Sequence, residues 1–319
     1  MILTVTLNAA IDRNVAVPSF QRGRRHRVVE QHASAGGKGV NVARALKLLG
    51  RPVIATGLAG GPTGTRMVER LTEESILNDF LRIREETRTN TAIVDPTSGE
   101  QTEINERGPH VDADELDRFV DKLLYLAQGA DVCVLAGSTP PNVPADIYAT
   151  LVSRLRGFGL LTVVDTWGDP LRAVLRAGPD IVTPNVIEAE EVVGYEFNDQ
   201  AETVNGLHEL TRLGAREAVI TNERGCLALL RGEDGPKVVR VEIDPLETVA
   251  AVGSGDALLA GYVAARYRGE SSEEALAFGV ACGAQSTQHF GAGALELREA
   301  DRLRSSVTVT ELQPASALS

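Results

Sequence analysis

The sequence predicts an α/β protein with a doubly wound, mostly parallel sheet, helices on both faces and a small β-sheet lid. Short β-branched runs alternate with amphipathic stretches, which is typical of parallel strands joined by crossover helices. Val132–Ala136 is apolar throughout, so we expect it in the sheet centre. The predicted strands are Ile2–Leu7, Val53–Leu58, Val132–Ala136, Leu161–Asp165, Ile181–Thr183, Ala218–Asn222 and Cys226–Leu230. The predicted helices are Val40–Leu49, Thr63–Glu74, Glu115–Ala127, Ala145–Arg156, Val186–Val193 and Glu202–Leu213.

Several of these helices carry start and stop signals. Asp112 and Glu115 have the spacing of a capping box, in which two side chains satisfy free amides at a helix start. Gly50, Gly129 and Gly214 follow helical patterns, where glycine favours a C-terminal stop.

Two segments break the alternation, Asn14–Ala33 and Arg88–Ile104. Both show period-2 polar alternation, and we expect antiparallel lid strands from about residues 12–35 and 87–107. Lids over open α/β sheets commonly close on a substrate. No linker divides the chain, so we expect one domain over residues 1–305 and a loosely ordered tail over 306–319.

Composition narrows the class of partner. The 319 residues are 43% hydrophobic and 24% charged, with a net charge of −12, which argues against nucleic-acid or membrane partners. An anionic ligand would need a local basic pocket. Cys133, Cys226 and Cys282 lie in apolar runs without metal-ligand spacing, so we expect small buried hydrophobes. The start of the chain is typical of a first strand rather than a targeting segment, and the cytoplasm is the expected location.

The segment from Gly253 to Asp256 is the most informative one. Gly253 and Gly255 let the backbone turn tightly, so the amides around Ser254 can point into one concavity at a helix start, which suits phosphate. Asp256 would be useful there if a hydroxyl must lose its proton while a phosphoryl group arrives. We expect this helix to run from about Ala257 to near Gly269, and the alternative is a glycine-rich turn with Asp256 as its N-cap.

A second glycine cluster, Gly36–Gly39, precedes a predicted helix. It lacks the spacing Gly-x-x-x-x-Gly-Lys-Ser/Thr, so the sequence excludes a P-loop. The glycines permit close approach of a ligand, with Lys38 and Asn41 facing it, although a plain loop-to-helix junction would have the same pattern.

Five motifs together resemble those of the PfkB (ribokinase-like) sugar kinases, from the first strand to about Gly293. More narrowly, the chain is similar to the branch with 1-phosphofructokinase and tagatose-6-phosphate kinase. The motifs occur in family order: Asn8-Ala9-Ala10-Ile11-Asp12, Gly36-Gly37-Lys38-Gly39-Val40-Asn41-Val42-Ala43, Gly137-Ser138-Thr139-Pro140, Pro184-Asn185-x-x-Glu188 and Gly253-Ser254-Gly255-Asp256.

The resemblance implies an ATP-dependent kinase. It makes Asp256 the base that deprotonates the acceptor hydroxyl, while the amides of Gly253, Ser254 and Gly255 stabilise charge on the transferred group. It also implies that Asn185 and Glu188 order Mg²⁺ largely through water, and it leaves open a requirement for K⁺. Without the other motifs, Glu188 would be interpreted as a first-turn carboxylate of its own helix.

The resemblance also places the nucleotide. It implies ATP contacts from Asn185, Ser254 and Gly255, and from Thr221 and Gly225 in a loop after a strand. Glu223 departs from the family pattern, which more often has glycine at this position. The segment Phe278–Ala284 resembles the adenine-side helix, and tight packing against a neighbouring helix is an equal interpretation.

For the acceptor, the resemblance implies a sugar held by Asp12, Gly37, Lys38, Asn41, Asn90 and Ser138. Arg88 matches a phosphate-contacting arginine of the phosphosugar branch, and Arg25 and Arg27 lie where related lids supply further cations. Arginine suits a phosphate because its planar fork binds two oxygens at once.

The implied reaction converts D-fructose 1-phosphate to fructose 1,6-bisphosphate. The alternatives are tagatose 6-phosphate or fructose 6-phosphate as acceptor, an unphosphorylated sugar, and a sugar-phosphate sensor without turnover. A homodimer formed through the lid is expected from the resemblance.

Overall fold

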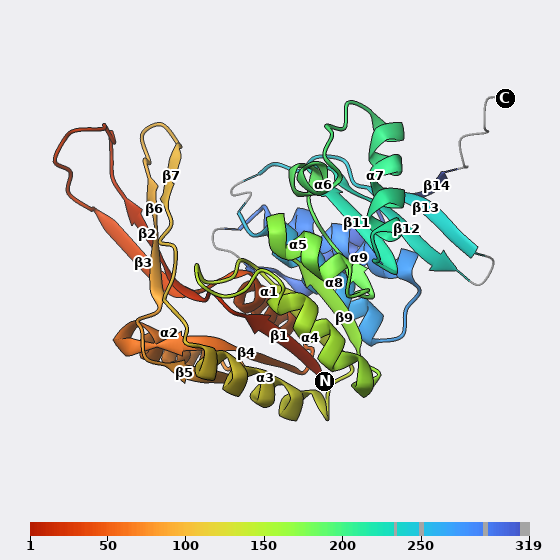
Figure 1. Cartoon of the computed structure of the whole chain (residues 1–319). Coiled ribbons are helices and arrows are strands. Elements are labelled where there is room, and N and C mark those ends of the chain that lie inside the picture. Colours follow the sequence, from red (N-terminus) through yellow and green to blue (C-terminus); the bar gives the residue numbers. More distant parts are fainter. Residues whose placement is uncertain (233–234, 249–251, 290–292, 313–319) are drawn as a thin grey trace.

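The main body of the protein is a ten-stranded sheet, from which a second, four-stranded sheet projects (Figure 1). A computed structural model of the chain describes residues 1–232, 235–248, 252–289 and 293–312. The strands of the large sheet, in spatial order, are β14 (Thr308–Leu312), β13 (Gly235–Glu242), β12 (Gly225–Gly232), β11 (Glu217–Asn222), β10 (Ile181–Val182), β9 (Leu161–Asp165), β8 (Val132–Ala136), β1 (Ile2–Thr6), β4 (Val53–Gly60) and β5 (Leu77–Ile83). All pairs from β5 to β11 are parallel and the remaining three are antiparallel. The predicted fold class is confirmed.

Helices cover both faces of this sheet because alternate strand residues point to opposite sides. Cys133 and Leu135 of β8 belong to one buried cluster, while Val132 and Val134 belong to the other. One face carries α1 (Lys38–Leu48), α2 (Gly61–Glu73), α8 (Ser254–Tyr267), α9 (Ser272–Ser286) and α10 (Leu297–Arg304). The other carries α3 (Ala113–Ala127), α4 (Ile147–Leu155), α5 (Gly168–Leu175), α6 (Val186–Val193) and α7 (Gln200–Arg212), with a short 3₁₀ turn at Arg156–Phe158.

The four-stranded sheet is the predicted lid. Its strands, in spatial order, are β3 (Glu30–Gly36), β2 (Ala10–Ala16), β6 (Arg88–Val94) and β7 (Gln101–Ile104). The outer pairs are antiparallel, but the central pair, β2 and β6, is parallel, so the fully antiparallel expectation was wrong. The reason is topological: β2 leaves the main sheet after β1 and β6 leaves it after β5, and these two parallel strands send the chain outward from the same edge.

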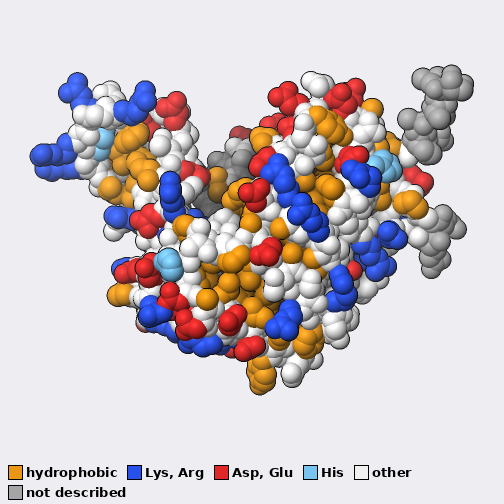
Figure 2. Space-filling model, in the orientation of Figure 1, with side chains coloured by type: hydrophobic (Ala, Val, Ile, Leu, Met, Phe, Trp, Pro, Cys, Tyr) orange, Lys and Arg blue, Asp and Glu red, His pale blue; other side chains and the backbone are white. Residues whose placement is uncertain are grey.

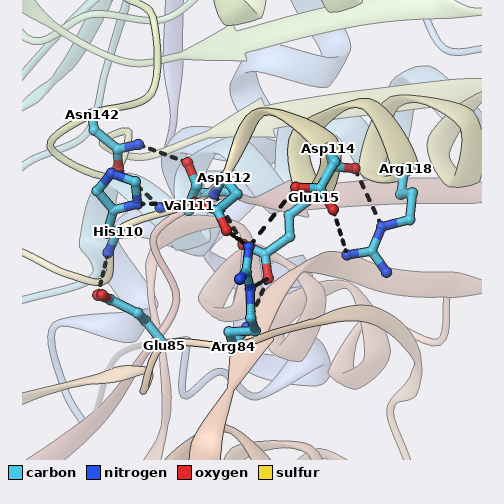
Figure 3. Close-up of polar contacts among 9 residues, drawn as sticks. All are labelled: Arg84, Glu85, His110, Val111, Asp112, Asp114, Glu115, Arg118 and Asn142. Atoms are coloured by element: carbon cyan, nitrogen blue, oxygen red, sulfur yellow. Dashed lines mark hydrogen bonds and ion pairs between the residues drawn. The ribbon is translucent and has the colours of Figure 1, made fainter.

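The base of the lid is fixed to the start of α3 (Figure 3). The predicted capping box of Asp112 and Glu115 is confirmed, and the second oxygen of Glu115 accepts from the amide of Arg84 at 2.8 Å. The amide of His110 donates to Glu85 at 2.8 Å. These contacts join the chain that enters the lid after β5 to the chain that leaves it after β7.

The end of the chain differs from the expectation. Thr308–Leu312 forms β14, which pairs with β13 at the sheet edge, so the prediction of a loosely ordered tail was wrong for these residues. The five residues carry a weak local signal, and their pairing depends on the neighbouring strand. Residues 313–319 lie outside the described part of the chain. The sequence analysis also missed β5, β13, α5 and α10.

The cysteines pack as expected. Cys133, Cys226 and Cys282 are free and buried, and burial raises the pKa of each thiol well above its ordinary value. Among the helices of the described residues, none has the length and apolar character needed to cross a membrane.

Candidate active site

A cavity of about 570 Å³ lies at the carboxyl ends of the parallel strands, where doubly wound sheets bind ligands. The carboxyl ends of β9 and β11 and the residues just after β10 and β11 border it, together with the starts of α1, α6 and α8. Eight of its lining residues present polar side chains or glycine backbone to the cavity: Lys38, Asp165, Asn185, Glu188, Thr221, Gly225, Ser254 and Gly255.

The predicted glycine turn begins α8. Gly253 caps the helix with a φ of 86°, a left-handed conformation that favours glycine, and the helix starts at Ser254 rather than near Ala257. Ser254 and Gly255 line the cavity. The free amides and positive end of a 14-residue helix therefore border the space where an anion could bind.

Asp256 lies in the first turn of α8 and is only 6% exposed. Its Oδ2 accepts a hydrogen bond of 2.8 Å from the amide nitrogen of Asn41 on α1. Burial raises the pKa of Asp256 to about 7, while the ammonium of Lys38 acts in the opposite direction and Asp165 adds to the rise. The carboxyl group is thus enclosed between α1 and α8, directly after Ser254 and Gly255, which line the cavity, while Asp256 itself is not a lining residue.

Lys38 joins several elements at the cavity wall. It is the first residue of α1, and its Nζ lies 2.7 Å from Asp165 Oδ1 and 4.0 Å from Glu188 Oε1. Its ammonium also lies 5.5 Å from the ring centre of Trp167. Sequence reasoning missed Asp165, although a carboxylate that ends an apolar strand at the ligand-binding edge was an available signal.

The acceptor-side residues meet where the lid leaves the main sheet. Asp12 on β2 and Asn90 on β6 are register partners, and Asn90 donates to Asp12 Oδ1 at 2.8 Å. Burial raises the pKa of Asp12. Gly36 allows this arrangement, because a Cβ there would lie 2.0 Å from Asp12 Oδ2. Gly37 caps α1 beside this group.

Ser138 follows β8 and accepts a hydrogen bond of 3.1 Å from Asn8. Arg88 lies close by, but its guanidinium already donates to the backbone carbonyls of Asn8 (2.9 Å and 3.2 Å) and Glu106 (2.9 Å). Because Ser138 and Arg88 both contact Asn8, the two residues lie together on the acceptor side.

Arg25 and Arg27 are not brought to this cavity. They are exposed in the loop between β2 and β3, at the outer end of the lid, where Figure 2 shows basic side chains gathered away from the main body. The seven-residue strand β2 carries this loop away from the edge of the main sheet. The basic pocket expected from the sequence is therefore not formed by these arginines within one chain.

The segments predicted to contact the nucleotide line the cavity. Thr221 lies near the end of β11 and Gly225 begins β12, and both line the cavity, as do Glu223 and Arg224 in the tight connection between the two strands. On α9, Gly283 and Ala284 also line the cavity. The same helix packs tightly on α8, where a Cβ on Gly279 would lie 2.8 Å from the backbone oxygen of Leu258, so the packing interpretation is confirmed and the adenine contact stays a prediction.

Asn185 and Glu188 form a capping box at the start of α6. Each side chain accepts from the other residue's amide at 2.9 Å, and both residues line the cavity. Within the described ranges there is no group of three His, Cys, Asp or Glu side chains that could hold a metal. A bound Mg²⁺ usually has only one or two protein ligands, because it keeps several waters and binds substrate phosphates. Asn185 and Glu188 therefore fit an ion that is held largely through water.

The fold and the site define a phosphotransferase that acts on an alcohol group. The model of the pfkB family carbohydrate kinases matches residues 3–299, and the chain belongs to that family. The chain is 31% identical over 283 residues to the 1-phosphofructokinase of Borreliella burgdorferi, which covers 89% of this chain and 90% of that protein. The resemblance stated from the motifs is confirmed.

Two solved structures extend the similarity. The possible 1-phosphofructokinase of Thermotoga maritima superposes with a TM-score of 0.87 at 28% identity, over 98% of this chain and 100% of that one. Phosphofructokinase-2 of Escherichia coli in complex with fructose-6-phosphate gives a TM-score of 0.87 at 26% identity, over 95% and 98%. That protein has also been solved with potassium and as a tetrameric inhibited form.

Proposed function

We propose that the protein transfers the terminal phosphoryl group of ATP to D-fructose 1-phosphate, giving fructose 1,6-bisphosphate. One observation carries the proposal: the buried carboxyl of Asp256 lies directly after the helix-start residues Ser254 and Gly255, which border a cavity large enough for a nucleotide. The similarity to a 1-phosphofructokinase over most of the chain supports the choice of acceptor.

In the proposed reaction the acceptor hydroxyl oxygen attacks the terminal phosphorus of ATP, and the bond to the bridging oxygen of ADP breaks. Asp256 takes the hydroxyl proton, and a pKa near 7 suits a base that works at neutral pH. The amides of Gly253, Ser254 and Gly255 would stabilise the charge on the moving group. Lys38, fixed by Asp165, supplies a positive charge at the cavity wall.

The nucleotide would be held by Thr221 and Gly225 together with Asn185. Asn185 and Glu188 would hold Mg²⁺ largely through water, and the ion would neutralise phosphate charge. The potassium-bound relative makes K⁺ a component to include in assays of this protein.

The acceptor would be held by Asp12, Gly37, Asn41 and Asn90, with its phosphate near Arg88 and Ser138. Arg25 and Arg27 lie away from the cavity of their own chain, so they would contribute cations only from the lid of a second copy. We also propose a homodimer through the lid, since Val28 and Val29 are exposed there at 46% and 66% and a relative forms a tetramer.

A second acceptor, fructose 6-phosphate, is favoured by the relative solved with that sugar. Tagatose 6-phosphate requires the same chemistry. The three sugars differ in where the phosphate and the free hydroxyl lie. The position of Arg88 and of any other cation at the acceptor phosphate would therefore decide which sugar is phosphorylated.

The test is a panel of initial rates with ATP and Mg²⁺, with and without K⁺, measured by coupled ADP release. The acceptors are fructose 1-phosphate, fructose 6-phosphate, tagatose 6-phosphate, fructose and ribose. We expect the highest kcat/KM with fructose 1-phosphate. A higher value with another sugar phosphate would correct the acceptor, and binding without ADP release on any sugar would identify a sensor.

A further inference from the structure

Arg44, one helical turn after Asn41 on α1, is held by three separate segments of the chain. Its guanidinium donates to Glu74 at the end of α2 at 2.5 Å and 3.0 Å, and to the carbonyl of Ala35 on β3 at 2.7 Å. It also donates to the side-chain oxygen of Asn41 at 3.1 Å. The side chain is 15% exposed, so these contacts are largely shielded from water.

The contact with Asn41 fixes the direction of that amide. A guanidinium only donates hydrogen bonds, so the Asn41 atom that faces Arg44 must be the carbonyl oxygen. The amide nitrogen then points the other way, where it donates to Asp256 Oδ2 at 2.8 Å. A flipped amide would place N–H groups against the guanidinium and an oxygen against the carboxylate, and both contacts would be lost.

We propose that Arg44 is a positioning residue for the reaction: it orients the Asn41 amide so that Asp256 is held in its proton-accepting, ionised form. Arg44 acts through Asn41 rather than on the substrate. The inference rests on the proposed role of Asp256 as the base. It adds a function for the ion pair between Arg44 and Glu74, which would otherwise only join α1 to α2.

Other charges also act on the Asp256 carboxyl. Lys38 on α1 favours its ionised form, while Asp165 at the end of β9 and Asp12 on β2 oppose it. Burial, the largest influence, also opposes it. The hydrogen bond from Asn41, the ammonium of Lys38 and the positive end of α8 all favour the ionised carboxyl, and of these only the hydrogen bond depends on the orientation set by Arg44.

The test is a titration of the Asp256 carboxyl carbon by NMR in protein labelled at aspartate. The resonance is assigned by its absence from Asp256→Asn. In Arg44→Met the Asn41 amide is free to rotate and accept from the protonated acid, so we expect the midpoint to rise by about one pH unit. The acid limb of the pH profile of kcat should shift by the same amount, so kcat at pH 6 should fall approximately tenfold. The KM for ATP should stay within about twofold of the parent value.

A double-mutant cycle separates the amide from a simple charge effect. If Arg44 acts through Asn41, then adding Arg44→Met to Asn41→Leu should leave the midpoint where Asn41→Leu alone puts it. A shift of the same size in both backgrounds would overturn the proposal, since it would show a direct effect of the lost charge.

The matched control is Arg304→Met. Arg304 also pairs with a glutamate, Glu270, at 2.7 Å and with a backbone carbonyl at 3.0 Å, but Glu270 lies beyond the opposite end of α8 from Asp256. We expect a similar fall in Tm and an unchanged Asp256 midpoint.

An unchanged midpoint in folded Arg44→Met would overturn the proposal. If that variant does not fold, Glu74→Gln takes its place: it weakens the grip on Arg44, and its midpoint must rise in the same direction. The titration needs no turnover, so it tests the role of Arg44 separately from the proposed reaction. Activity of Asp256→Asn would overturn the proposed role of Asp256 as the base, whatever the titration shows.

Discussion

The acceptor side and the nucleotide side of the site are built differently. On the acceptor side, polar side chains already bond to one another: Asn90 to Asp12, and Asn41 to Asp256. The nucleotide side combines polar side chains such as Lys38 and Asn185 with an apolar patch formed by Ile243, Leu258, Leu259, Val280 and Ala284. Under the proposed function, the protein would fix the geometry of the sugar hydroxyl in advance through polar contacts, whereas it would offer the nucleotide polar groups together with an apolar surface.

The acceptor side also retains unused hydrogen-bonding capacity. Within the described residues, the buried oxygens Asn8 Oδ1 and Asn90 Oδ1 accept no hydrogen bond. A buried polar atom without a partner is costly, and a sugar hydroxyl could satisfy it. Selectivity between acceptors is therefore expected to be sharper than selectivity between nucleotides.

The largest expected effect comes from Asp256→Asn, which removes the proposed base at the junction of the two sides. We expect turnover to fall by about 10²–10⁴-fold, because an amide cannot take the hydroxyl proton. Binding of ATP and of sugar phosphate, measured by calorimetry, should be nearly retained. Near-normal turnover would remove Asp256 from the base role.

The same variant should be more stable than the parent at high pH. The pKa of Asp256 is raised from 3.8 to about 7 in the folded state, so the native protein holds a proton that the unfolded chain has lost. Stability of the parent therefore falls as pH rises from about 4 to 7, by up to about 1.4 kcal/mol per pH unit, and an asparagine avoids this loss. Urea unfolding at pH 5, 6, 7 and 8 should show that the difference in free energy of unfolding between Asp256→Asn and the parent grows up to pH 7. A constant difference would contradict the raised pKa.

The next effect in size concerns Asp12→Ala, which breaks the acceptor side alone. Loss of a charged hydrogen-bonding partner should raise the KM for the sugar phosphate by about 10–100-fold and leave the KM for ATP nearly unchanged. Asp121→Ala, an exposed aspartate on α3, is the control and should change neither. Equal weakening of both substrates would show that the two sides are not independent.

The smallest effect is expected from Ala284→Phe, which fills part of the nucleotide side. We expect an approximately tenfold weaker affinity for ATP and little change for the sugar phosphate, since a soft apolar surface can partly adjust. Fluorescence of Trp167 can report ATP binding, because it is the chain's single tryptophan and lies 5.5 Å from Lys38 at the cavity wall. Ala201→Phe, at an exposed position of α7, is the matched control. Weakening of sugar binding alone would reverse the assignment of the two sides.

Local sequence patterns were sufficient for much of the fold. Val132–Ala136 and Leu161–Asp165 were predicted with the observed bounds, because short runs rich in apolar and β-branched residues between polar turns specify buried parallel strands. The edge strand Thr308–Leu312 could not be found in this way, since a half-exposed strand gains its stability from the pairing with β13.

By itself the sequence determined the order of the motifs and the glycine turn that precedes α8, because these depend on neighbouring residues. Only the tertiary structure decided which charges meet: Lys38 pairs with Asp165, and Arg44 orients Asn41 toward Asp256. Residues 127 and 215 positions apart are joined in these contacts, and strand order, which no local pattern encodes, brings them together.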